Sequence, residues 1–269
     1  MLRLAIRVRR SDAELVLAEL LELAPGGVEE TDGGDVVEYA VYGAPGELPA
    51  LPDLRAAAGE ALVEVSTSGV ADDWDVRWRE FHRPVLIGTP PTRLRLRAPW
   101  HEALPGDVII DPGQAFGTGA HPTTRLCLEA LCSLASPPAP TPLVDAGCGS
   151  GVLAIAAARL GFAPVLGLDH ERESVAATLE NAVVNGVDVQ ARRWDLRSEP
   201  VPAAPIVVAN LLRPLLLALR FDAVPDTLVA SGLLAHEGDE VAAAMGVHGL
   251  RETRRLQSDG WLALVLRRA

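Results

Sequence analysis

The sequence predicts an α/β protein. Its main domain is expected to be a doubly wound, mostly parallel seven-stranded sheet, with a small N-terminal α+β domain of the ferredoxin-like kind before it. From residue 143 onward, apolar runs of strand length alternate with helical segments, and the last two runs form an antiparallel pair. This order is typical of a doubly wound sheet with a reversed strand at its edge. Before residue 68, the order is strand, helix, strand, strand, helix, strand, which is the ferredoxin-like arrangement.

The small domain, residues 1–67, has a local signal for each of its elements. Apolar residues alternate with arginines over 2–9, which predicts a half-buried strand. A capping box at 11–14 begins a helix that ends before Pro25. Two strands over 28–31 and 36–42 flank Asp-Gly-Gly, a hairpin signal. A short helix over 54–62 and a strand over 62–67 complete the predicted domain.

Residues 68–98 are expected to be a linker that contains a short helix. Trp74, Trp78 and Phe81 have the i, i+4, i+7 spacing of one helix face. We favour packing of this face against one of the domains, and a substrate-facing patch is the alternative. The segments 84–89 and 93–97 are either strands or extended linker. The third predicted part, residues 99–269, is the main domain.

A glycine-rich loop over 111–121 precedes a predicted helix over 123–135. Gly113, Gly117 and Gly119 make the loop flexible, so it could fold over a bound ligand. The alternative is an ordinary surface loop. Phe116 argues against that alternative, because an aromatic side chain among glycines requires something to cover.

The strongest motif is Asp145-Ala-Gly-Cys-Gly-Ser-Gly151, between an apolar strand and an apolar helix that begins at Val152. A strand, a glycine turn and a helix N-terminus together bind nucleotide-like ligands. The spacing is G-x-G-x-G, with Val152 where a dinucleotide fingerprint needs its last glycine. An aspartate before this turn is the pattern of S-adenosylmethionine (SAM)-dependent methyltransferases, and a carboxylate suits the ligand's ammonium group.

Four predicted strand ends carry residues that suit such a ligand. Ligands bind beyond the carboxyl ends of the strands in a doubly wound sheet. Asp169 follows the glycine turn by roughly 20 residues, where an acid accepts hydrogen bonds from ribose hydroxyls. Asp195 ends the next strand and could meet an adenine amino group. Gly147 and Asn210 end two others.

Charge and composition argue against several classes of function. The formal net charge is −12, which disfavours direct nucleic-acid binding because arginines and lysines must neutralise phosphates. No apolar run approaches the roughly 20 residues of a membrane span. The three cysteines show no metal-binding spacing, which indicates reduced thiols and a cytoplasmic protein. We expect no metal and no membrane association.

The motifs together resemble the bacterial methyltransferases of large-subunit ribosomal protein eleven. The resemblance covers about residues 72–269 by motif and rests on four segments: Ala115-Phe-Gly-Thr-Gly-Ala-His-Pro-Thr-Thr124, the glycine turn, Asn181-Ala-Val-Val-Asn-Gly186 and Val208-Ala-Asn-Leu-Leu212. It implies a class I methyltransferase-like fold with SAM as cofactor. It also implies recognition of the ribosomal protein by the small domain. The cofactor-binding residues that we expect are Thr124, Gly147, Gly149, Asp169, Asp195 and Asn210, with Phe116, Gly117 and Thr118 in the loop Phe116–His121 that closes over the cofactor.

The implied activity is N-methylation of a lysine side chain, an N-terminal α-amine, or both. We expect Asn210 to act in catalysis by orienting the neutral amine. No aromatic residue follows in Asn210-Leu-Leu, which fits an aliphatic amine better than a planar amide or base. His170 and Glu171 stand where many relatives show a second acid and then proline. Three alternatives are a SAM enzyme acting on RNA or a small molecule, an NAD enzyme, and a non-catalytic binding module.

Overall fold

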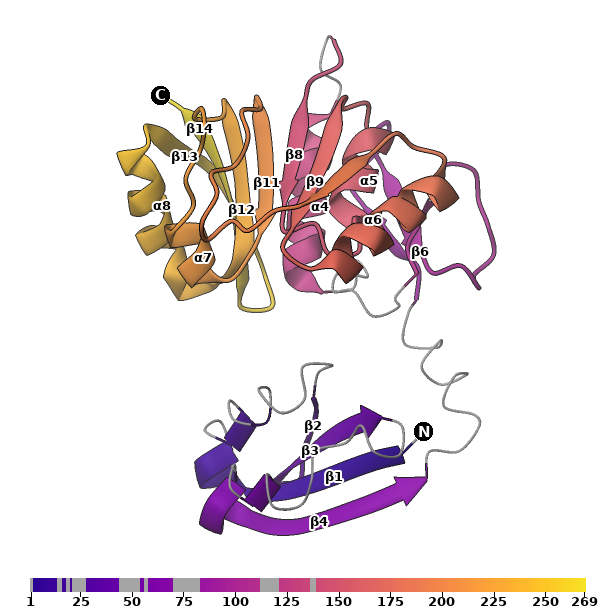
Figure 1. Ribbon diagram of the computed structural model, residues 1–269, viewed down its shortest axis with the longest axis vertical. Helices are drawn as coiled ribbons and strands as arrows, with labels where there is room; N and C mark the ends of the chain where they lie inside the picture. Colours follow the sequence, from indigo (N-terminus) through magenta and orange to yellow (C-terminus); the bar gives the residue numbers. More distant parts are fainter. Residues whose placement is uncertain are drawn as a thin grey trace. The chain divides into compact units, whose positions relative to one another are not determined.

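The computed structural model describes residues 2–13, 16–17, 20, 28–43, 54–55, 58–69, 83–111, 121–135 and 139–269. The chain forms two compact units, Met1–Glu80 and Phe81–Ala269 (Figure 1). The predicted helix with Trp74 and Trp78 and the glycine-rich segment 112–120 lie outside the described residues. No helix in the described part of the chain is long and apolar enough to cross a membrane.

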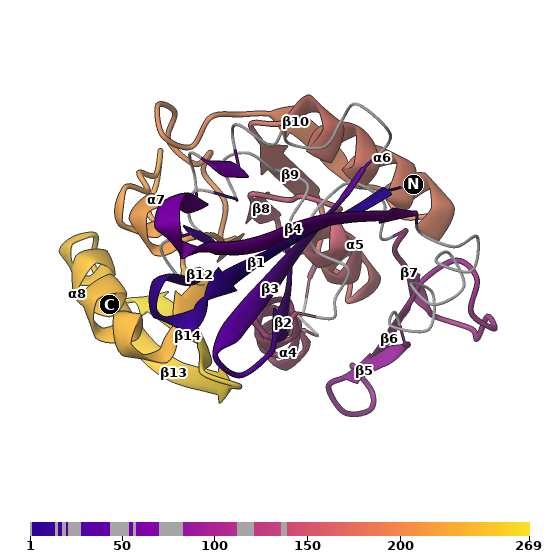
Figure 2. The ribbon, with the colours of Figure 1, turned by 90° about the horizontal axis from the view of Figure 1, so that it is seen from below.

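The smaller unit contains a four-stranded antiparallel sheet in the order β2-β3-β1-β4 (Figure 2), which is the ferredoxin-like order. Its strands are β1 (Leu2–Arg9), β2 (Glu29–Asp32), β3 (Val36–Gly43) and β4 (Leu62–Gly69). The alternation predicted for β1 is confirmed. Leu4, Ile6 and Val8 are buried, whereas Arg3 and Arg7 form ion pairs with Glu38 on the opposite face.

The larger unit is built on a seven-stranded sheet in the order β10-β9-β8-β11-β12-β14-β13. The strands are β8 (Leu143–Ala146), β9 (Val165–Asp169), β10 (Gln190–Arg193), β11 (Ile206–Asn210), β12 (Thr227–Leu234), β13 (Leu250–Ser258) and β14 (Trp261–Arg268). The first five pair in parallel, and β14 is antiparallel to both of its neighbours. The predicted mostly parallel sheet is therefore confirmed.

The sequence suggested that the reversed strand lies at the edge of the sheet. In the structure the reversed strand is β14, which lies one position inside the edge. β14 carries the buried apolar run Leu262–Leu266, whereas most side chains of β13 are exposed. A fully apolar strand gains more from burial on both faces than a polar one. The chain therefore reaches the edge first, in β13, and turns back to place β14 beside β12.

Helices cover both faces of this sheet (Figure 1). One apolar core includes residues of α4 (Pro122–Leu134), α5 (Val152–Arg159) and α6 (Arg172–Asn185). A second core includes residues of α7 (Arg213–Leu217) and α8 (Gly238–Val247). Helix α7 is shorter than the predicted 213–224. The chain beyond α7 does not continue the helix because Phe221 pairs with Val201 in an isolated β-bridge. In this bridge the Val201 N–H donates to the carbonyl of Arg220, and the Asp222 N–H donates to the carbonyl of Val201.

A third, small sheet occupies part of the segment that was expected to be a linker. It consists of β5 (Val85–Ile87), β6 (Leu94–Arg97) and β7 (Val108–Ile109). Ile87, Leu96 and Val108 are buried in the core that includes α4 and α5. Residues 83–98 therefore pack as part of the larger unit, and β7 brings the chain to the start of segment 112–120.

Candidate functional site

A cavity of about 710 Å³ lies at the carboxyl ends of the parallel strands β8, β9, β10 and β11. It is bordered by residues of the glycine turn, the strand ends and the first turn of α4. Those that the sequence predicted are Thr124, Gly147, Gly149, Asp169, Asp195 and Asn210. Phe116, Gly117 and Thr118 lie outside the described residues. The cavity therefore brings together every predicted site residue that the structure describes.

The glycine turn passes close to other backbone and side-chain atoms. Gly147 has a φ of 83°, and its N–H donates to the carbonyl of Leu168 at the end of β9. A Cβ added at Gly147 would lie 2.4 Å from Cδ2 of Leu211. Gly151 has a φ of 81° and is the N-cap of α5. A side chain at Gly147 would be strained and would displace Leu211 from the cavity wall.

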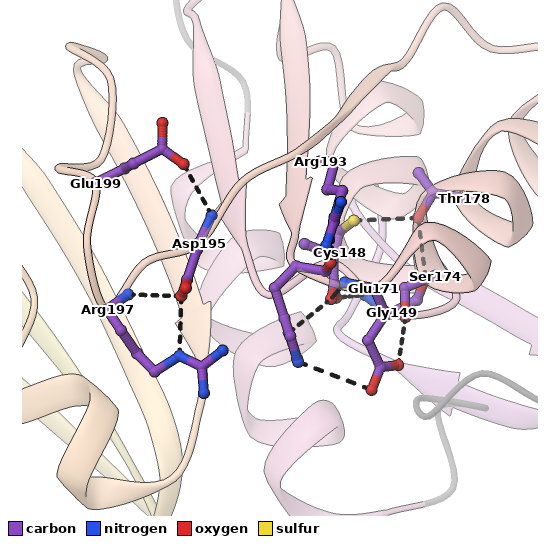
Figure 3. A network of polar contacts seen from close by, with 11 residues as sticks. Cys148, Gly149, Glu171, Ser174, Thr178, Arg193, Asp195, Arg197 and Glu199 are labelled. Atoms are coloured by element: carbon purple, nitrogen blue, oxygen red, sulfur yellow. Dashed lines mark hydrogen bonds and ion pairs between the residues drawn. The ribbon is translucent and has the colours of Figure 1, made fainter.

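Asp169 stabilises the turn from the end of β9. Its Oδ2 accepts a hydrogen bond from the Gly149 N–H at 3.0 Å, and its Oδ1 accepts one from the Glu171 N–H at 3.1 Å. Its side chain is 12% exposed. Figure 3 shows this network around Gly149 and Glu171. Asp169 thus combines contacts to the turn with a position on the cavity wall.

Asp195 follows β10 and lies in a second network, with Arg197 and Glu199 (Figure 3). Its Oδ1 accepts hydrogen bonds from Nε of Arg197 at 2.9 Å and from the Arg197 N–H at 3.1 Å. These bonds to Arg197 lower the pKa of the Asp195 carboxyl. An ionised Asp195 presents an acceptor to a ligand at this end of the cavity.

Asn210 and Thr124 meet across 86 positions of sequence. Nδ2 of Asn210, at the end of β11, donates to Oγ1 of Thr124 in the first turn of α4 at 3.3 Å. Thr124 is buried. Because Nδ2 is directed at Thr124, the amide presents its Oδ1 on the other side. The resemblance assigned both residues to one site, and the structure accounts for their proximity by the packing of α4 on the sheet.

His121, the last residue of the loop that was expected to close over the cofactor, borders the cavity, whereas Trp261 was missed. His121 is the N-cap of α4 and its ring stacks edge-on against Trp261, with centroids 4.8 Å apart. Burial lowers the pKa of His121, which favours the neutral form of the ring. The N-cap position before Pro122 was a usable signal for His121. Trp261 had none, because its place depends on the insertion of β14 beside β12.

Asp145 is not where the motif suggested. It is fully buried and does not border the cavity. Its Oδ2 accepts a hydrogen bond from the Ala154 N–H at 3.0 Å, and its Oδ1 has no hydrogen-bond partner among the described residues. Burial raises the pKa of this carboxyl to about 7. Asp145 therefore holds the start of α5 and does not face a ligand's ammonium directly.

Comparison with known proteins shows the family of the chain that carries this site. Residues 53–269 match the family model described as ribosomal protein L11 methyltransferase (PrmA). The chain belongs to this family. The match includes the whole of the larger unit and the end of the smaller one, so it covers the cavity and all the elements that border it.

Individual relatives carry the same name as the family. A protein from Heliobacterium modesticaldum named ribosomal protein L11 methyltransferase is 39% identical over 209 residues, which are 74% of this chain and 65% of that protein. One from Geobacter sulfurreducens with the same name is 37% identical over 232 residues, 81% of this chain and 74% of that protein. The alignment thus spans slightly less than two thirds of the first relative.

A solved structure shares the fold. The crystal structure of a ribosomal protein L11 methylase from Lactobacillus delbrueckii subsp. bulgaricus superimposes with a TM-score of 0.60 at 27% sequence identity. The match covers 68% of this chain and 99% of that one. The class I methyltransferase-like fold expected from the glycine turn is confirmed.

Proposed function

We propose that this chain is a SAM-dependent protein N-methyltransferase that methylates amino groups of ribosomal protein L11. The observation that carries the proposal is the family match over a cavity bordered by Thr124, Gly147, Asp169 and Asn210. The family match, over residues 53–269, spans the segments that contain these residues.

The described residues fit SAM as the cofactor. SAM carries a ribose, an ammonium and a cationic sulfonium. The cavity wall has the carboxylates of Asp169, Glu171 and Asp195 for such a ligand. Gly147 has no Cβ, and one added there would collide with Leu211, which also borders the cavity. When bound, SAM supplies a methyl group for in-line displacement, and the protein's task is alignment.

The acceptor amine must be neutral to act as a nucleophile. With a lysine pKa near 10.4, deprotonation at pH 7 costs about 4–5 kcal/mol, and much less for an α-amine. Leu211, Leu212, Leu215 and Trp261 border the cavity, and an apolar wall favours the neutral amine. Oδ1 of Asn210 would accept a hydrogen bond from this amine and orient its lone pair. Water then takes up the released proton.

The small unit would hold the protein substrate while a segment of that substrate reaches the cavity. Tethering raises the local concentration of each amine and allows several to be presented in turn. A chain that begins at Phe81 is expected to fold and bind SAM but to lose methylation of L11 by orders of magnitude. Unchanged methylation by this shorter chain would place recognition in the larger unit.

The deciding experiment uses methyl-labelled SAM and separated components of the large ribosomal subunit. Incorporation of label into L11, located by mass spectrometry on lysine or α-amino nitrogen, is the expected result. Asn210→Ala, which is expected to incorporate label more slowly, is the matched comparison. Label in ribosomal RNA, or in no macromolecule, would contradict the proposed substrate.

A further inference from the structure

Helix α6 packs against the rest of the larger unit through a face that carries polar side chains. Its fully or nearly fully buried side chains include Ser174, Thr178, Asn181 and Asn185. Their spacing of four, three and four residues puts them on one face of the helix. Buried polar side chains are costly unless they are hydrogen-bonded, so this face, which we call the polar stripe, requires specific partners.

Two members of the polar stripe bind carbonyls of the glycine turn. Oγ1 of Thr178 donates to the carbonyl of Gly149 at 3.0 Å and lies 3.3 Å from Sγ of Cys148 (Figure 3). Nδ2 of Asn181 donates to the carbonyl of Ser150 at 2.9 Å. Oδ1 of Asn181 also accepts a long hydrogen bond, 3.4 Å, from the Asp111 N–H.

Asn185 differs from these two in what it binds. Its Oδ1 accepts from the Ile109 N–H at 2.8 Å, and its Nδ2 donates to the Ile109 carbonyl at 2.6 Å. These bonds attach β7 to α6 and do not involve the glycine turn. The polar stripe therefore contains two residues of the same type, four positions apart, of which only Asn181 contacts the turn.

The glycine turn needs external support because its own backbone is permissive. Gly149 and Gly151 both have positive φ, 53° and 81°. Glycines reach many other conformations at little cost. The N–H of Gly149 is held by Asp169, and the neighbouring carbonyls are held by Thr178 and Asn181. One N–H and two carbonyls of the turn are thus held, the N–H by a residue at the end of β9 and the carbonyls by residues of α6.

We propose that Thr178 and Asn181 are positioning residues for the cofactor. They hold the Gly149 and Ser150 carbonyls, and so keep the turn in its ligand-binding conformation. This inference rests on the proposed function and extends it to residues that do not touch the cofactor. If the turn adopts this conformation only part of the time, the apparent Kd of the ligand equals the intrinsic Kd divided by the fraction of time spent in it.

The test compares two substitutions of Thr178 with opposite chemistry. Thr178→Val keeps the shape and loses the hydroxyl, whereas Thr178→Ser keeps the hydroxyl and loses a methyl. Titration calorimetry is expected to show a SAM Kd raised about three- to tenfold in Thr178→Val, the effect of one lost hydrogen bond. Thr178→Ser is expected to bind close to normally. A role in packing alone predicts the reverse order.

Asn181→Leu and Asn185→Leu form the matched control pair. Both lose buried hydrogen bonds and are expected to melt at lower temperature. Only Asn181→Leu should raise the SAM Kd and speed hydrogen exchange over 147–151. If Thr178→Val and Asn181→Leu are folded and bind SAM like the unmodified chain, the positioning role is wrong while the proposed function stands. If the unmodified chain binds no SAM, both fail together.

Discussion

Replacing Asp145 with asparagine should change the pH dependence of stability in a predictable direction. The carboxyl is fully buried, and its pKa is raised to about 7 from an ordinary 3.8, chiefly by loss of hydration. Between these two pH values the folded protein keeps the proton and the unfolded chain releases it. Protonation therefore stabilises the fold at low pH, and this contribution is lost as pH rises through 7.

The magnitude follows from the size of the shift. About three pKa units at 1.36 kcal/mol each correspond to about 4 kcal/mol of unfolding free energy, spread over pH 4 to 7. Asparagine cannot ionise, and its Oδ1 can still accept the hydrogen bond from Ala154 that Asp145 accepts. As the pH rises from 4 to 7.5, the unfolding free energy of Asp145→Asn should thus increase by about 4 kcal/mol relative to that of the unmodified protein.

Urea unfolding followed by circular dichroism at several pH values measures this difference directly. Effects of titrating groups that do not interact with Asp145 are common to both proteins and cancel in the comparison. The expected difference curve is flat below pH 4 and above pH 8, with the rise between. A difference that stays constant across the whole range would show that Asp145 is ionised when buried, and the account of its environment would be wrong.

Three further substitutions test the cavity. Asp169→Ala should weaken SAM binding by roughly 1.5–3 kcal/mol, the range for hydrogen bonds to a charged group; unchanged affinity in calorimetry would remove Asp169 from the cofactor site. Asn210→Ala should lower kcat more than it raises the SAM Kd, and steady-state methylation at the normal rate would contradict the orienting role. Gly147→Ala should destabilise the fold by about 1–2 kcal/mol because of its left-handed φ, and should also weaken SAM binding through the contact with Leu211. A normal melting temperature with normal affinity would refute that last expectation.

Much of the site followed from local sequence signals. The carboxyl ends of parallel strands share one edge of a sheet, so Gly147, Asp169, Asp195 and Asn210 could be placed together once the strands were recognised. The strands themselves were evident from apolar runs of the right length between helical segments. A glycine turn at the first of them supplied the ligand class.

Other features depended on contacts between distant parts of the chain. Periodicity reports which face of an element is buried, but not which element covers it. Helix α6 illustrates the difference, because its buried face is polar and binds backbone carbonyls and N–H groups that no side-chain pattern encodes. The motif that contains Asn181 and Asn185 was visible in the sequence, but what its asparagines bind was not.

The sequence by itself determined the alternation of strands and helices, the glycine turn and the set of residues at the strand ends, since each depends on neighbours along the chain. Only the tertiary structure decided the order of the last two strands, the burial of Asp145 and the meeting of His121 with Trp261. Those outcomes depend on which surfaces exclude the most water when the whole sheet assembles, and that is a property of the complete fold.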